Sequence, residues 1–307
     1  MEREQLRGLQ AAVTAYVLWG LLTVYWKQLA GLNPVELIGW RVVSASVVMA
    51  LYMHVTGGWP AVRGALTDRA TARRIIVSAV LLTANWATYV WAVLNSRIIE
   101  TALGYFLAPL GTMAIGVFVL GEQITPRKRW SVAFALAAVV VLTVSYGELP
   151  WIAVILGLTW SAYGLTKRRV PLEAAQSLAA ETLVLIVPAI IIVGVGWGRT
   201  DGVPQVATSA DWGFLLGSGI ITVVPLVLFA FAAKRVPFTV LGPTNYLVPI
   251  IGFLLGWLMY DEPLSTGRFA GFALVWVALT LVTIDTVRSP QQTAREPVTT
   301  GTSRDRR

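Results

Sequence analysis

The sequence predicts an all-α integral membrane protein with ten transmembrane helices arranged as two inverted five-helix repeats. Three observations predict this fold class: long apolar stretches recur along the chain, basic residues alternate between the connections, and one motif occurs twice. The chain has 307 residues, of which 56% are hydrophobic and 13% are charged, whereas soluble domains carry roughly a quarter charged residues. A soluble fold of this size could not cover so much apolar surface.

The apolar stretches have the length of membrane-spanning helices. About 20 mostly apolar residues are needed to cross a hydrocarbon core about 30 Å thick, because a helix rises about 1.5 Å per residue. Strands of a membrane barrel would be about half as long and would alternate in polarity. The ten stretches are 9–26, 34–54, 74–94, 98–120, 130–146, 149–165, 174–197, 212–233, 237–260 and 266–287.

The basic residues predict the orientation, since cytoplasmic connections collect Lys and Arg. With the N-terminus inside, inner segments hold 19 of the 24 basic residues and outer connections hold four. The remaining one, Arg41, lies within the second stretch. We therefore expect a multi-pass protein of the cytoplasmic membrane with both termini in the cytoplasm.

An internal repeat divides the chain into two halves. At an offset of 140 residues a P-x6-G-x5-E pattern occurs twice, at Pro109, Gly116 and Glu122 and again at Pro249, Gly256 and Glu262. Each half has five stretches, so the second half enters the membrane from the opposite side. We expect a first repeat over 1–146, a second, inverted repeat over 147–287, and a polar, disordered cytoplasmic tail over 288–307. Inverted repeats suit alternating access, which favours a transporter.

Two ionisable residues lie inside predicted spans, where a charge is costly and marks either a solute pathway or a structural pair. Arg41 is about seven residues from the outer end of its span, and Glu181 is about seven from the inner end of its span. Arg41 could bind a carboxylate through its fork of donors, and Glu181 could accept a proton or bind an amine. Alternatively, each holds backbone carbonyls or a neighbouring helix.

Further polar and aromatic residues lie at mid-membrane depth and are candidates for contacting solute. Residues 85 and 225 correspond at the 140 offset, so both halves interrupt their apolar pattern at one depth, where a shared site is expected. Single Tyr or Trp residues are otherwise typical interface anchors. The candidates are Asn85, Trp86, Tyr89, Tyr105, Thr222, Asn245 and Tyr246.

Other residues are expected to act in gating or in structure. Glu100 opens the fourth span and could be an outer gate, a proton site or a carboxylate stabilised by the helix dipole. Pro109, Glu122, Pro249 and Glu262 are expected to be structural, with the two glutamates acting as loop clamps beside basic residues. Gly252 and Gly256 form a G-x-x-x-G motif, which permits close helix packing.

Several of these motifs resemble the RarD-type branch of the EamA family, in the drug/metabolite transporter superfamily. The resemblance covers nearly the whole chain before the tail, with departures at Trp40 and Asn245. It implies a ten-span inner-membrane protein with two inverted halves, and many such members export amino acids or other metabolites. The residues that carry it are Asn85-Trp86, Trp91-Ala92-Val93, Glu100, Leu103-Gly104-Tyr105, Pro109, Gly121-Glu122, Thr222, Pro225-Leu226, Leu241-Gly242, Tyr246, Pro249 and Glu262.

The function expected from these features is secondary transport of a small metabolite or drug-like solute, such as an amino acid or another carboxylate, by alternating access and in the direction of export. The expected partners are the solute, the lipid bilayer, and protons or a counter-solute, in a monomer or homodimer. We expect no cofactor, no metal and no nucleic-acid partner. A membrane enzyme is disfavoured because the sequence has neither a metalloprotease nor a Walker motif. A membrane receptor or sensor is the other alternative.

Overall fold

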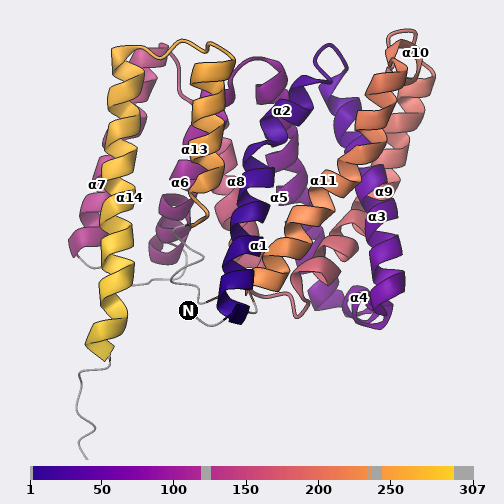
Figure 1. The fold of residues 1–307 in the computed structure, drawn as a ribbon, viewed down its shortest axis with the longest axis horizontal. Helices are drawn as coiled ribbons and strands as arrows, with labels where there is room; N and C mark the ends of the chain where they lie inside the picture. The colour runs from indigo at the N-terminus through magenta and orange to yellow at the C-terminus, as the bar shows by residue number, and fades with distance from the viewer. Residues whose placement is uncertain (1–2, 119–125, 234, 237–243, 294–307) are drawn as a thin grey trace, which may run out of the picture.

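The computed structural model describes residues 3–118, 126–233, 235–236 and 244–293, which form a bundle of roughly parallel and antiparallel helices (Figure 1). Within these ranges the chain contains helices, turns and bends but no strand. The helices of the first half are α1 (Arg3–Gly20), α2 (Leu22–Lys27), α3 (Pro34–Thr56), α4 (Trp59–Thr67), α5 (Arg69–Leu94), α6 (Ile98–Phe118) and α7 (Pro126–Tyr146). Those that follow are α8 (Trp151–Lys167), α9 (Ala174–Trp197), α10 (Val203–Val206), α11 (Ser209–Ala233), α13 (Leu247–Leu254), the π-helical turn η1 (Leu255–Met259) and α14 (Thr266–Thr293).

Local sequence signals set where several of these helices begin and end. Asn33 caps α3, since its side chain accepts hydrogen bonds from the backbone N–H groups of Val35 at 2.9 Å and Glu36 at 3.3 Å. Such caps satisfy donors that have no partner within the helix. The same helix ends at Gly57, whose φ of 67° is a left-handed conformation that glycine adopts without strain. Asp68 caps α5 in the same way as Asn33 caps α3.

Each of the ten stretches expected from the sequence contains a helix, and seven helices in the described ranges are long and apolar enough to cross a membrane. Those seven are 3–27, 34–56, 69–94, 129–146, 174–197, 209–233 and 266–284, and 98–113 and 247–259 are shorter apolar helices. The chain is therefore a multi-pass helical protein, whereas the count of ten spans stays a prediction. Residues 237–243 of the ninth stretch lie outside the described ranges, and so do residues 294–307 of the expected tail. α14 continues to Thr293, past the expected end of the last stretch.

Helices from the two halves alternate in space. α3 packs on α9, α6 on α13, and α7 on α14. α1 packs on α11 and α5 on α8, while α6 packs on α8 and α13 on α1. Finally, α3 packs on α11, and α5 packs on α9. The N-terminal end of α1 and the C-terminal end of α14 lie on the same side of the bundle (Figure 1).

Glycines allow some of these helices to approach closely. A Cβ atom placed on Gly219 of α11 would lie 2.5 Å from the backbone of Ser44 on α3, and the N–H of Gly219 donates to Ser44 Oγ at 2.9 Å. In the G-x-x-x-G motif, a Cβ on Gly256 would lie 2.9 Å from Ile99 of α6, whereas one on Gly252 would make only an ordinary contact. Gly256 therefore serves helix packing within one chain.

Candidate functional site

Arg41 of α3 is buried in the bundle interior, where it contacts aromatic rings and one hydroxyl. Only 4% of the residue is exposed. Its guanidinium carbon lies 3.9 Å from the ring centre of Trp86 and 5.3 Å from that of Trp26. Its Nε donates to Thr222 Oγ1 at 3.3 Å. Three expected site residues, from α3, α5 and α11, are thus brought together.

The charge of Arg41 has no acidic partner among the described residues. None of the ion pairs found there includes it. Its Nη1 is buried without a hydrogen-bond acceptor, and so is Nε1 of the neighbouring Trp26. A buried group left in this state costs free energy. The site therefore presents unused donors.

Two tyrosines extend this cluster toward α2 and α6. The rings of Tyr89 and Tyr105 lie 6.0 Å apart. Tyr89 shares a hydrogen bond of 2.9 Å with Thr23, and the Tyr105 hydroxyl donates to Asn85 Oδ1 at 3.1 Å. Tyr105 also meets Trp160 edge to face at 6.0 Å.

Asn85 is held by structural contacts. Its Nδ2 donates to the carbonyl of Leu156 at 3.2 Å and to Thr159 Oγ1 at 3.0 Å, both on α8. Together with the bond from Tyr105, these contacts join α5, α6 and α8. Asn85 therefore positions Tyr105, and its own polar atoms have partners.

The cavity beside the tyrosines is small. Its volume is about 10 Å³, which is close to the minimum that one water needs. A solute can therefore reach this region only after the helices separate. The lining residues are Trp19, Gly20, Thr23, Tyr89, Thr101, Ala102, Tyr105, Val248, Pro249 and Gly252.

Glu181 is fully buried in a separate cluster on α5, α8 and α9. Its Oε1 accepts from Ser78 at 2.8 Å, from Lys167 Nζ at 3.0 Å and from Ser177 at 3.4 Å, and its Oε2 accepts from the Tyr163 hydroxyl at 3.1 Å. Lys167 also donates to Ser177 Oγ at 2.6 Å. The carboxylate is thus both paired and hydrogen-bonded, in the manner of a structural ion pair.

Glu100 lies in the first turn of α6 and is 4% exposed. Its Oε1 accepts from Arg97 Nε at 2.6 Å, and Arg97 Nη2 also donates to Glu148 at 2.7 Å. The second oxygen of Glu100 is buried without a partner. Glu100 thus retains one free hydrogen-bond acceptor at the N-terminal end of α6.

Glu262 contacts the same helix end from the other half of the chain. Its two oxygens accept the backbone N–H groups of Ile98 at 2.6 Å and Ile99 at 2.8 Å. It therefore clamps the start of α6, while the nearby Arg268 donates to the carbonyl of Pro263 at 2.7 Å. The other expected clamp, Glu122, lies outside the described residues.

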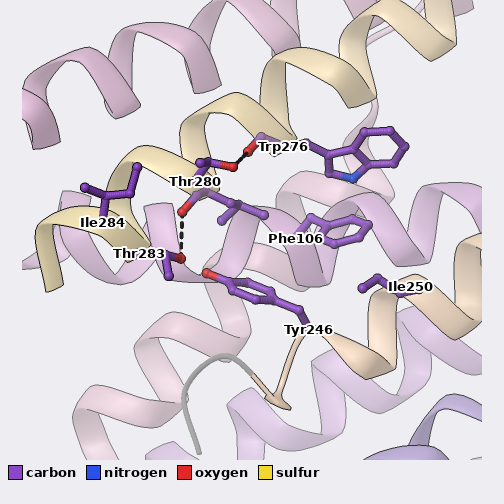
Figure 2. Close-up of a pocket in the computed structure, with 8 residues that line it drawn as sticks. Phe106, Tyr246, Ile250, Trp276, Thr280, Thr283 and Ile284 are labelled. Carbon is purple, nitrogen blue, oxygen red and sulfur yellow. Dashed lines mark hydrogen bonds between the residues drawn. The ribbon is translucent and has the colours of Figure 1, made fainter. Parts of the chain in front are cut away.

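Tyr246 lines a different, open and mainly apolar cavity of about 470 Å³ (Figure 2). Its hydroxyl points toward Thr283 of α14. Asn245 precedes it and is half-buried. The two expected prolines are placed differently: Pro109 lies within α6, and Pro249 is buried in the first turn of α13. Tyr246 and Asn245 are thus not brought to the Arg41 cluster. The lining residues are Phe106, Tyr246, Ile250, Trp276, Leu279, Thr280, Thr283 and Ile284.

Two residues that complete these clusters are not among those expected from the sequence. Trp26 belongs to Tyr25-Trp26-Lys27, which resembles an interfacial end of a span. Lys167 was counted among the basic residues of an inner connection, yet it ends α8 and its side chain is 22% exposed. Its partner Glu181 lies on the next helix, α9, so the residue spacing within α8 gives no signal of this pair.

The long apolar helices, the interleaved halves and the polar groups buried at their centre define a multi-pass membrane protein of the transporter class. The EamA-like transporter family matches the chain over residues 6–144 and again over 150–284. The chain belongs to this family, as a RarD-type member of the drug/metabolite transporter superfamily.

Relatives cover almost the full chain. Protein RarD of Streptomyces exfoliatus is 36% identical over 95% of this chain and 92% of its own length. The uncharacterized transporter PA0485 of Pseudomonas aeruginosa is 33% identical over 92% of this chain and 95% of its own. Protein RarD of Escherichia coli K12 is 31% identical over 96% of this chain and 100% of its own. One solved protein crystal structure is similar with a TM-score of 0.57 and 19% identity, covering 90% of this chain and 97% of that one; it supports the fold alone.

Proposed function

We propose that this protein is a secondary transporter that exports a small metabolite or drug-like solute across the cytoplasmic membrane by alternating access. The observation that carries the proposal is the pattern of helix packing. If the chain is two inverted halves, exchanging α1 with α8, α3 with α9, α5 with α11, α6 with α13 and α7 with α14 should map the main packing pairs onto one another. The exchange turns the pair α1–α11 into α8–α5, and it turns α6–α8 into α13–α1. It also turns α3–α11 into α9–α5. The pairs α3–α9, α6–α13 and α7–α14 map onto themselves.

The division into a first repeat over 1–146 and an inverted second repeat over 147–287 is supported by the two family matches, which fall on either side of residues 145–149. The orientation is supported by the 19 basic residues assigned to inner segments. With ten spans, both chain ends are cytoplasmic, which agrees with the ends of α1 and α14 lying on one side (Figure 1).

Contacts between the halves close both ends of the bundle. At the outer end Glu262 clamps α6, and Lys27 Nζ lies 5.2 Å from the ring centre of Tyr260. At the cytoplasmic end Arg235 Nε bonds Glu4 at 3.0 Å, and Arg74 donates to the carbonyl of residue 169 at 2.9 Å. In alternating access these two sets of contacts open in turn, while the site around Arg41 stays between them.

Glu100 and Glu181 are the candidates for proton coupling. Glu100 has an unpartnered buried oxygen at the outer end, whereas Glu181 is engaged by four donors nearer the cytoplasmic end. A proton antiporter loses flux when an ionophore collapses the pH gradient, and an exchanger does not. Glu100→Gln in proteoliposomes should remove that sensitivity if Glu100 carries the proton.

Cross-linking tests alternating access directly, because the chain has no native cysteine. The variant Lys27→Cys/Tyr260→Cys joins the halves outside, and Glu4→Cys/Arg235→Cys joins them inside. In proteoliposomes given labelled amino acids, aromatic acids and chloramphenicol, we expect flux of at least one solute. A thiol cross-linker at either pair should stop that flux and a reductant should restore it, while the single-cysteine variants keep it. Undiminished flux with both pairs cross-linked would contradict the mechanism, and binding without flux of any solute would favour a receptor or sensor.

A further inference from the structure

The guanidinium of Arg41 is a buried positive charge that lies over two indole rings, and its environment predicts what binds there. Stacking on Trp86 at 3.9 Å and Trp26 at 5.3 Å offsets part of the loss of hydration. Aromatic faces carry no net charge, however, so they do not neutralise the cation. An unpaired buried charge is strongly destabilising compared with a paired one.

The atoms around this cation are donors that lack acceptors. Arg41 Nη1 and Trp26 Nε1 are both buried and both without a hydrogen-bond partner. These residues are 4% and 0% exposed, so bulk water does not solvate them in this closed form. A carboxylate that reaches both N–H groups once the helices separate would accept from them and neutralise the charge.

None of the described residues that contact Arg41 carries a carboxylate, so a solute amine bound in this cluster would not be neutralised. Glu181 is buried in a separate cluster, and its oxygens already accept from Ser78, Tyr163, Lys167 and Ser177. Glu100 keeps one free oxygen, but it lies in the first turn of α6 and is paired with Arg97. The hydroxyl of Thr222, which accepts from Arg41, donates to the carbonyl of residue 218 at 2.8 Å. The cluster can therefore neutralise one negative charge on a bound solute but cannot neutralise a positive charge.

We propose that the solute bound at Arg41 is a monoanionic organic acid without a charged amine, and that Trp26 is a second donor to its carboxylate. This rests on the proposed transport function, since it names the solute class of the same central site. It also narrows the class expected from the sequence, which included amino acids.

Three compounds that share a phenylethyl group test the charge rule: 3-phenylpropionate, phenylalanine and phenethylamine, each at equal ionic strength with purified protein. Isothermal titration and the apparent melting temperature report binding without requiring flux. We expect 3-phenylpropionate to bind and raise the melting temperature, and the other two to bind at least ~10-fold more weakly, since an unpaired charge must otherwise be buried. Sodium chloride alone is a further probe, and equal stabilisation by chloride would overturn the assignment to an organic acid.

Variants assign the donors. Trp26→Phe keeps an aromatic face but removes the N–H, so affinity for 3-phenylpropionate should fall about 10-fold, the loss of one hydrogen bond to a charged group. Arg41→Lys keeps the charge but loses the planar fork and should weaken binding further. Two matched controls should leave binding unchanged. Trp130→Phe changes a tryptophan that is 65% exposed, and Arg199→Lys changes an arginine that is paired with an exposed Asp.

The outcomes separate this inference from the proposed function. Equal binding of phenylalanine or phenethylamine, no binding of the acid, or unchanged affinity in Trp26→Phe would overturn the inference even if another solute is transported. Binding of the acid with the expected charge rule would support the inference even if proteoliposomes show no flux, a result that would instead count against transport. If Arg41→Lys does not fold, the three compounds and Trp26→Phe still decide the matter.

Discussion

Replacing Glu262 should destabilise the protein more than its position in a connection suggests. Its carboxylate accepts the first two N–H groups of α6, at 2.6 and 2.8 Å, and the residue is 7% exposed. Glu262→Ala leaves two buried donors without acceptors and removes a negative charge from the positive end of a helix dipole. Capping and charged hydrogen bonds of this kind predict a loss of about 2–4 kcal/mol. Glu262→Gln keeps one acceptor oxygen without the charge and should lose about half as much.

The assay is thermal unfolding of the detergent-purified protein, followed by intrinsic tryptophan fluorescence. Glu148→Ala is the matched control, because Glu148 also bonds near this helix end but its side chain is 56% exposed; exposed pairs contribute about 0–1 kcal/mol. The expected order of stability is wild type and Glu148→Ala together, then Glu262→Gln, then Glu262→Ala. Equal melting temperatures for Glu262→Ala and Glu148→Ala would refute the view that Glu262 holds the start of α6.

The remaining predictions concern the interior. Lys167→Met should destabilise the protein by about 3–5 kcal/mol, because it leaves the carboxylate of Glu181 buried without its counter-charge. Adding Glu181→Gln to this variant should restore part of the lost stability. A double mutant that is no more stable than Lys167→Met would contradict the pairing. Gly219→Ala should lower the melting temperature, since its Cβ would overlap the backbone of Ser44. Gly213→Ala in the same helix meets nothing within 4 Å and should be neutral or stabilising by up to about 1 kcal/mol; equal effects of the two alanines would refute the close approach.

Helix positions were predictable from sequence because hydropathy and span length act over short windows. The stretch 174–197 coincides with α9, and 34–54 falls within α3. Short helices and irregularities within helices were not predicted. α4 and α10 are too short to give a periodic signal, and the first stretch is divided at Leu21 between α1 and α2. The π-helical turn at 255–259 also left no mark in the apolar pattern.

The site was predictable in its components but not in its pairings. Arg41, Trp86 and Thr222 were each identified from depth and polarity, and they meet in the structure. Trp26 and Lys167 were missed because each lies on a different helix from its partner, and sequence spacing within a helix says nothing about contacts across the bundle. Residues 245 and 246 share a depth with this cluster, yet Tyr246 lines another cavity, so depth alone does not define a site.

The small cavity between Tyr89 and Tyr105 has a consequence for the movement of protons. A chain of water molecules conducts protons only if several stand in a row, and this cavity of about 10 Å³ has room for about one. In the closed form, a continuous file of waters therefore does not form past these tyrosines. Protons cannot follow water through this part of the bundle until the helices separate.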